Sequence, residues 1–230
     1  MVKSKVEAPA GGGKEAPARK MSYEEFLEWL DEDTWAEWVD GEVVMLSPAS
    51  RRHQEVRHFL ETLIRGYAEL HDLGVVLSAP FQVKLEEVRR GREPDLLFVS
   101  REHLERLKDT YLDGPPDLVV EIVSPESVSR DRGEKFYEYA QAGVPEYWLI
   151  DPQIRWADFY RLEPEARRYR PAFGGEEGVY RSEVLPGFWL RVEWLWQDPL
   201  PPVDEALLEV GGEAYAQRVL ERLRRRGFLP

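Results

Sequence analysis

The chain of 230 residues contains no cysteine. A disulfide framework, a thiolate nucleophile and a cysteine zinc site are therefore excluded. Its four histidines, His53, His58, His71 and His103, form no HxxxH-type pair, which argues against a histidine-rich metal site. Any bound metal would have to be a hard cation held by oxygen ligands.

Long apolar runs are also missing. No run approaches the roughly 18 residues of a membrane span, and residues 1–20 lack the apolar core of a signal peptide. We therefore expect a cytoplasmic protein without a membrane partner. The chain has no asparagine either, and the absence of Asn and Cys together with 33% charged residues predicts a thermophilic origin.

The charge of the chain limits its possible partners. A net charge of −13 argues against a protein that coats nucleic acid non-specifically, because such proteins usually carry a basic footprint. It does not exclude a basic cleft of limited size. With 43% hydrophobic residues, the chain can bury the core of one domain with extensions.

Composition divides the chain into three parts. Residues 1–20 are rich in Ala, Pro and Gly and show no periodicity, so we expect a flexible tail. Residues 21–200 carry the hydrophobic patterns of a folded domain. Residues 201–230 end in a basic helix, which predicts a C-terminal helical extension.

Besides a short helix over residues 101–108, three helices are predicted within the domain. Ser22 and Glu25 form a capping box at the start of a short helix. Apolar residues recur at helical spacing over residues 50–71, which predicts the longest helix. Asp131 is the predicted N-cap of a third helix that ends at Gly143.

Apolar runs predict the strands. They lie at residues 74–85, 94–100, 117–124, 146–152 and 156–162, a hairpin is expected over 37–46, and a Trp-rich strand-like segment follows at 184–196. The order of the elements predicts an α/β fold with a mixed central sheet flanked by helices.

One predicted strand contains a carboxylate. The segment "DLVVEIVSPES" is aliphatic enough for burial on both faces, yet Glu121 lies in its middle. In "EPDLLFV", Asp95 follows Pro94 at the start of another strand. If the two strands are neighbours, Asp95 and Glu121 converge at one end of the sheet. Two such carboxylates repel each other unless a divalent cation lies between them, and Mg²⁺ is commonly held in this way.

These segments carry a resemblance. "PDLLFV", "PDLVVEIVSP" and "GEKFYEYAQAGVPEYWLIDP", with "DGE" at residues 40–42 and "RHQ" at 52–54, resemble the Uma-type family of bacterial restriction endonucleases, formerly a domain of unknown function. That family belongs to the PD-(D/E)XK nuclease superfamily. The resemblance runs from about Ser22 to Trp196.

The resemblance implies a restriction-endonuclease-like core, a Mg²⁺ (or Mn²⁺) dependent nuclease acting on DNA, and a homodimer. Asp95 corresponds to the aspartate of the PD motif and Glu121 to its second acid, so both are implied metal ligands. The first helix of this superfamily often supplies an auxiliary group near the metal. His53, in the matching "RHQ", is the candidate for that role.

The sequence departs from the motif at one position. The motif has a lysine two residues after the second acid, and this chain has Val123 there. Lys135, on the following helix, is our predicted substitute, by analogy with superfamily members whose lysine has moved to that helix. From residue 21 onward the chain has only three lysines, Lys84, Lys108 and Lys135, so a lysine can mark a position that needs a compact charge. Lys84 is the rival cation.

Each candidate also has a structural interpretation. Glu121 can be a core glutamate paired with an arginine, and Asp95 can simply begin a strand. Lys135 can pair with Asp131 on the surface, and His53 can be a structural residue on the core-facing side of its helix. Other features favour structural roles: Glu42 as a turn residue, the eight tryptophans as core or interface, and the C-terminal arginines as a solvated helix face.

Three functions remain open from the sequence. The first is a metal-dependent nuclease with Asp95, Glu121, Lys135 and His53 at its site. The second is a catalytically degenerate nuclease fold that acts as a binding or scaffold module, which the missing motif lysine favours. The third is a two-carboxylate glycoside hydrolase, which would work without a divalent metal.

Overall fold

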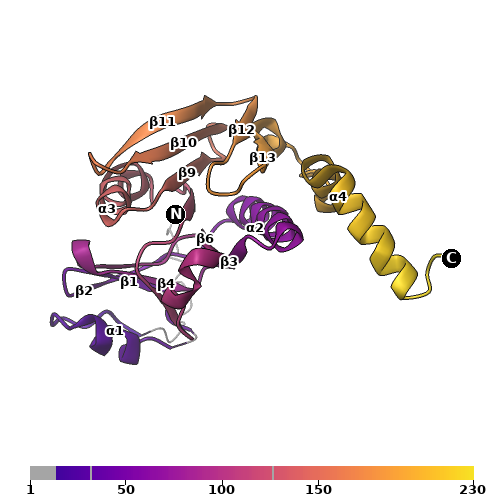
Figure 1. Cartoon of the computed structure of the whole chain (residues 1–230). Coiled ribbons are helices and arrows are strands. Elements are labelled where there is room, and N and C mark those ends of the chain that lie inside the picture. The colour runs from indigo at the N-terminus through magenta and orange to yellow at the C-terminus, as the bar shows by residue number, and fades with distance from the viewer. Residues whose placement is uncertain (1–13, 32, 126) are drawn as a thin grey trace, which may run out of the picture.

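The aliphatic segment around Glu121 forms the inner strand β8 (Leu118–Ile122) of a six-stranded sheet (Figure 1). The structure is a computed structural model that describes residues 14–31, 33–125 and 127–230. The strand order is β11-β10-β9-β8-β6-β3, and β8 pairs parallel with β9 and antiparallel with β6. The other strands are β3 (Gly74–Ser78), β6 (Leu96–Ser100), β9 (Glu146–Asp151), β10 (Trp156–Glu163) and β11 (Arg168–Gly175). The predicted mixed sheet is confirmed.

A second sheet was not predicted. It has the order β2-β1-β5-β4-β7 and lies with α1 at the opposite end of the molecule from β10 and β11 (Figure 1). Its strands are β1 (Ala36–Val39), β2 (Glu42–Met45), β4 (Gln82–Leu85), β5 (Arg90–Arg92) and β7 (Tyr111–Asp113). The single strand expected over residues 74–85 is therefore two strands, β3 and β4, that belong to different sheets.

Helices cover both faces of the six-stranded sheet. On one face, the longest predicted helix is confirmed as α2 (Arg51–His71), with its apolar stripe buried. On the other face lies α3 (Lys135–Ala142). Strand alternation in β8 therefore sends Leu118, Val120 and Ile122 to the α2 side, and Val119 to the α3 side together with Glu121. Each fully buried aliphatic side chain contributes about 1.5–3 kcal/mol to folding.

Short elements complete the chain. A hairpin of β12 (Val179–Arg181) and β13 (Trp189–Arg191) packs on the α2 side, so only part of the Trp-rich segment is a strand. The segments Glu86–Val88, Arg101–Arg106 and Val192–Trp196 are 3-10 helices, and Arg130–Glu134 is a π-helical turn that leads directly into α3.

The C-terminal helix is in two parts. α4 (Val203–Arg225) bends at Gly212, whose backbone is not helical, and its N-terminal part packs on α2. The remainder projects away from the body (Figure 1), with Arg218 donating a hydrogen bond to the carbonyl oxygen of Glu69 in α2. Among the described residues, no helix is both long enough and apolar enough to cross a membrane.

The stretch predicted as a flexible tail is described only in part. Residues 1–13 lie outside the described residues. Lys14 pairs with Asp31 at 2.6 Å and donates to the carbonyl oxygen of Trp29, and Arg19 pairs with Glu25. The described end of this stretch is therefore held against α1 (Tyr23–Trp29).

The predicted capping box of α1 is present. Ser22 Oγ accepts a hydrogen bond from the Glu25 amide at 3.1 Å, and the Glu25 carboxylate accepts one from the Ser22 amide at 2.8 Å. Ser22→Ala is expected to lower the free energy of unfolding by about 1 kcal/mol, because the Glu25 amide at the helix start loses its side-chain acceptor. Urea unfolding of this variant checks the value, and an unchanged midpoint would contradict it. Ser129→Ala, at a position without a capping hydrogen bond, is the matched control.

Candidate active site

The two predicted metal ligands lie side by side. In the antiparallel β6–β8 ladder, Leu96 pairs with Val120, so the next position places Asp95 opposite Glu121. Residues opposite each other across a ladder send their side chains to the same face. The convergence expected from the sequence is therefore confirmed, and the side chains of both acids line one pocket.

Asp95 is fixed by two donors. Its Oδ2 accepts a hydrogen bond of 2.7 Å from the amide of Ile122, and it lies 3.1 Å from Nε2 of His53. Because a carboxylate only accepts, Nε2 of His53 is the donor in this contact. His53 is buried, as its structural interpretation predicts, and it faces Asp95 in the pocket.

Glu121 is fixed by two donors from α3. Its Oε1 accepts hydrogen bonds of 2.9 Å from Nζ of Lys135 and of 2.9 Å from the hydroxyl group of Tyr139. Burial raises the pKa of Glu121 to about 8, although the adjacent Lys135 ammonium opposes the shift. Lys135 and Tyr139 are one helical turn apart, so both reach the same carboxylate.

Lys135 lies beside Glu121, whereas the motif position for a lysine holds Val123. Val123, at the motif position, is buried among apolar side chains on the α3 face. From α3, the Lys135 ammonium contacts Glu121, Glu37 at 3.1 Å and Asp131 at 3.6 Å. These carboxylates raise its pKa well above the ordinary value despite the opposing effect of burial, so Lys135 is an ammonium ion.

Asp131 differs from its predicted role. We expected it to be the N-cap of the third helix, but it lies inside the π-helical turn and is buried, facing Lys135. The predicted pair of Asp131 and Lys135 at i, i+4 therefore exists in the interior rather than on the surface. Burial raises the pKa of Asp131. Such π turns often occur at functional sites.

The second sheet contributes a group that the sequence analysis missed. Glu37 on β1 is fully buried between Lys135 and Arg92, with Nη1 of Arg92 2.8 Å from its Oε2. Burial alone would raise the pKa of Glu37, but Lys135 and Arg92 outweigh it and lower the pKa to about 2. Arg92 also pairs with Glu138 on α3. This network joins the second sheet to α3 behind the pocket.

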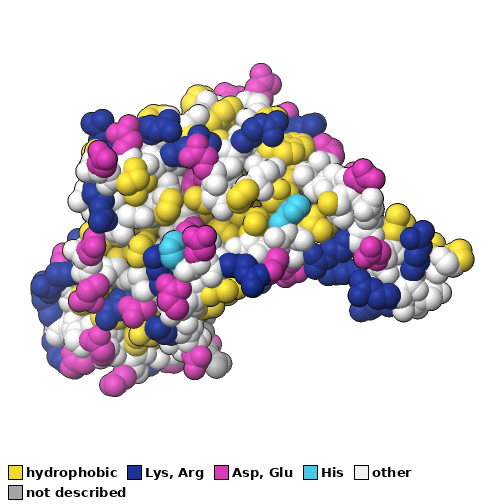
Figure 2. All heavy atoms as spheres, viewed as in Figure 1, with side chains coloured by type: hydrophobic (Ala, Val, Ile, Leu, Met, Phe, Trp, Pro, Cys, Tyr) yellow, Lys and Arg dark blue, Asp and Glu magenta, His cyan; other side chains and the backbone are white. Residues whose placement is uncertain are grey.

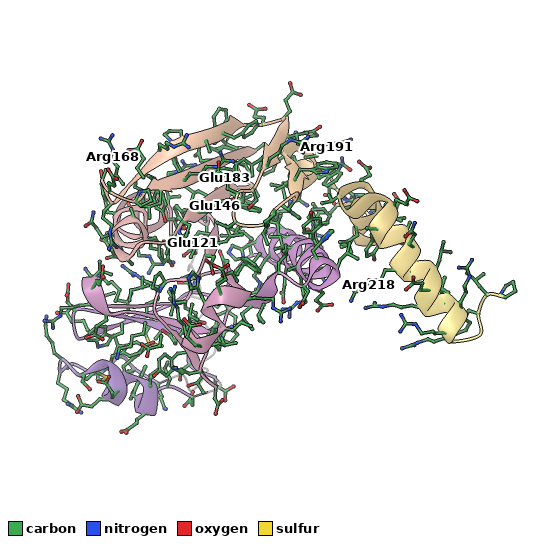
Figure 3. The ribbon with its side chains drawn as sticks, in the orientation of Figure 1. Glu121, Glu146, Arg168, Glu183, Arg191 and Arg218 are labelled. Carbon is green, nitrogen blue, oxygen red and sulfur yellow. The ribbon has the colours of Figure 1, made fainter. Side chains whose placement is uncertain are left out.

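The pocket lies where the two sheets, α2 and α3 meet. Its cavity measures about 90 Å³. Figure 3 places Glu121 in the interior, below α3. The titratable groups that line it are His53, Arg57, Glu93, Asp95, Glu121, Arg130, Asp131 and Lys135. Acids outnumber the arginine and lysine residues there, which suits a site for a cation.

The donor set fits a hard cation. Within the described part of the chain, hydrogen bonds reach only Oδ2 of Asp95 and only Oε1 of Glu121, which leaves one oxygen of each for a ligand. Two other buried pocket oxygens, Oε1 of Glu93 and Oδ1 of Asp131, have no hydrogen-bond partner among the described residues. Among the residues that the structure describes, no three His, Cys, Asp or Glu side chains are grouped to hold a metal ion, so a cation would complete its shell with water or substrate oxygens, as Mg²⁺ does.

The remaining candidates lie elsewhere. The rival cation Lys84 pairs with Glu24 and Glu86 and does not line the pocket. Glu42 on β2 is exposed and pairs with Lys20. Among the tryptophans, Trp35 lines the pocket, whereas most of the others belong to the cores or pack against them, including Trp29, Trp38, Trp148, Trp189, Trp194 and Trp196.

Known proteins resemble this chain. A solved structure titled "putative nuclease belonging to DUF820", from Anabaena variabilis ATCC 29413, aligns with a TM-score of 0.64 and 15% identity, covering 76% of this chain and 97% of that one. An uncharacterized protein of Synechocystis sp. is 28% identical over 136 residues, which are 59% of this chain and 70% of that protein. Residues 23–193 match the family Uma2, described as "Putative restriction endonuclease". Because this match spans most of the chain and contains every residue of the pocket, the protein belongs to the Uma2 family.

Proposed function

We propose that this chain is a Mg²⁺ (or Mn²⁺) dependent nuclease that hydrolyses phosphodiester bonds in DNA. The observation that carries the proposal is the convergence of Asp95, Glu121 and Lys135 in one pocket. Membership of the Uma2 family supports the reaction class, and the likeness to the DUF820 structure supports the fold on which such a site is built.

Asp95 and Glu121 would hold the cation through the oxygens that protein hydrogen bonds leave free. A bound divalent cation supplies positive charge that polarises a scissile phosphate and lowers the pKa of a nearby water. The chain prepares this arrangement by fixing both acids in advance. The Ile122 amide and His53 orient Asp95, and Lys135 with Tyr139 orients Glu121.

Lys135 would stabilise the negative charge that develops on the phosphate. Its raised pKa keeps it protonated, so it acts through its charge rather than as a base. Three carboxylates hold the ammonium group in position before substrate binds, and this preorganisation gives an electrostatic group its effect. Val123 thus need not be a lysine for the site to contain one.

His53 acts as a positioning residue in this proposal. Its Nε2–H donates a hydrogen bond to Asp95, and its place in α2 ties the acid to the longest helix of the domain. This contact keeps one Asp95 oxygen occupied and directs the other into the pocket.

Withdrawal of the metal tests the proposal. Supercoiled plasmid incubated with the protein at elevated temperature is expected to be nicked with Mg²⁺ or Mn²⁺, to remain intact with EDTA, and to be nicked again once Mg²⁺ exceeds EDTA. Agarose gel electrophoresis separates the two plasmid forms. Equal nicking in EDTA would contradict the metal dependence, and intact plasmid under all conditions would favour the scaffold alternative.

A further inference from the structure

Two arginines, Arg57 and Arg130, line the pocket but take no part in the ion pairs that surround Lys135. Arg57 follows His53 by one turn of α2, so both side chains lie on the same side of the helix. Nη1 of Arg57 donates a hydrogen bond of 3.3 Å to the carbonyl oxygen of Ala79, whose own amide donates to the backbone carbonyl of Asp95. The guanidinium group is therefore held beside the strand that carries the first acid.

Arg130 approaches the pocket from a different element. It begins the π-helical turn that also carries Asp131 and leads into Lys135. Its side chain lines the pocket, and its Nε is buried without a hydrogen-bond partner among the described residues. A buried guanidinium donor without a partner is costly, because it has lost its hydration and gained nothing in return. This donor points to a missing acceptor.

The charge of these two arginines is not neutralised in the described part of the chain. Neither takes part in an ion pair between described residues, whereas the third pocket cation, Lys135, pairs with three carboxylates. On the face shown in Figure 2, acidic and basic side chains are interspersed over the body, and several basic ones lie together on α4. An acidic protein that binds a polyanion needs its positive charge at the contact itself.

We propose that Arg57 and Arg130 bind the phosphate groups of the substrate backbone, on two walls of the pocket on either side of the acids. This inference rests on the proposed function and specifies which groups of the nucleic acid the site contacts. Arginine suits the role because its planar fork matches two oxygens of one phosphate. Contacts of this kind fix position without reading sequence, so the pocket recognises the backbone and not the bases.

Salt-dependent binding tests the proposal. Arg57→Gln and Arg130→Gln are each expected to bind a fluorescein-labelled DNA duplex about tenfold more weakly, measured by fluorescence anisotropy with Ca²⁺ in place of Mg²⁺. Each should also reduce the slope of log affinity against log salt by about 0.9, since one phosphate contact is lost. Arg170→Gln is the matched control, because Arg170 is an exposed arginine on β11 outside the pocket. Its slope and affinity should equal those of the wild type.

Conservative variants separate charge from loss of structure. Arg57→Lys and Arg130→Lys keep the positive charge, so the salt slope should remain while the affinity falls with the loss of the fork. Circular dichroism and thermal unfolding verify that all variants are folded. Wild-type slopes in both glutamine variants would overturn the proposal, as would a wild-type protein that does not bind the duplex at all.

Failure of the proposed phosphate contacts can be distinguished from failure of the nuclease proposal. If the wild type nicks plasmid with Mg²⁺ and both glutamine variants bind and nick equally well, the phosphate contacts are wrong and the nuclease stands. If no protein nicks plasmid but both variants lose affinity and salt slope, the phosphate contacts stand and hydrolysis is wrong.

Discussion

Glu121→Gln is expected to leave the protein folded and to slow metal-dependent nicking of plasmid by at least about a hundredfold. A glutamine has nearly the shape of the glutamate, and its Oε1 can still accept hydrogen bonds from Lys135 and Tyr139. It lacks the negative charge that a hard cation requires. The initial nicking rate with Mg²⁺, measured beside the thermal unfolding midpoint, checks both parts of the expectation.

The matched control is Glu146→Gln. Glu146 is a buried glutamate on β9, the strand beside β8, but it accepts hydrogen bonds from Trp148 and Ser182 and does not line the pocket (Figure 3). After correction for the folded fraction, this variant should nick plasmid at the wild-type rate. The prediction is wrong if Glu121→Gln cuts as fast as the wild type, or if folded Glu146→Gln is equally inactive.

The centre of the sheet could be predicted because its signal is local. Alternation along residues 117–124 assigns Glu121 to one face whatever the strand's neighbours are, and the structure confirms that face. The meeting of Asp95 with Glu121 required one further fact, the antiparallel pairing of β6 with β8. That pairing joins residues far apart in the chain, and the pattern of a single strand does not encode it.

The second sheet has a weaker signal. β5 is three residues long with the sequence Arg-Gly-Arg, which contains no apolar residue to mark burial. Arg92 and Glu37 nevertheless pair in the interior, because each neutralises the other once the two strands and α3 have assembled. A buried ion pair between distant segments is invisible to hydrophobic periodicity. The helical spacing of Lys135 and Tyr139 was the one local signal that could have identified a further site residue.

The predicted substitution of Lys135 for the motif lysine now has a geometric basis, although its role stays a prediction. A lysine at residue 123 would lie on the same strand face as Glu121 and among the apolar residues that pack under α3. A lysine on α3 reaches Glu121 from above the sheet and is also neutralised by Glu37 and Asp131. Lys135 lies at a different position in the sequence from the motif lysine, but its ammonium group lies next to the second acid, Glu121.

Lys135→Met is expected to lower the free energy of unfolding by about 3–5 kcal/mol and, in the fraction that folds, to slow nicking by about 10²–10³. Methionine fills a similar volume without charge, so it leaves Glu121, Glu37 and Asp131 without their shared cation. Urea unfolding in EDTA measures the stability, since a bound metal would otherwise replace part of the lost charge. An unchanged midpoint would show that the three carboxylates do not depend on Lys135.

The loss of unfolding free energy in Lys135→Met is expected to depend on pH. The folded-state pKa of Glu121 is raised above its ordinary 4.5, so the stability that its protonation contributes is fully present below pH 4.5 and is lost as pH rises through the folded value. Lys135 counters that loss by stabilising the ionised form. The deficit of Lys135→Met relative to the wild type should therefore be larger at about pH 9 than at about pH 5.

A double-mutant cycle with Glu121→Gln isolates the contact between the two residues. Glutamine removes one of the three carboxylates that Lys135→Met leaves uncompensated, so the double variant should be more stable than the sum of the single losses predicts. The difference is expected to be about 0.5–3 kcal/mol, the range for residues in direct contact. Strict additivity would mean that Lys135 acts mainly on Glu37 and Asp131. In that case its ammonium would stabilise the junction of the two sheets rather than the proposed second acid of the metal site.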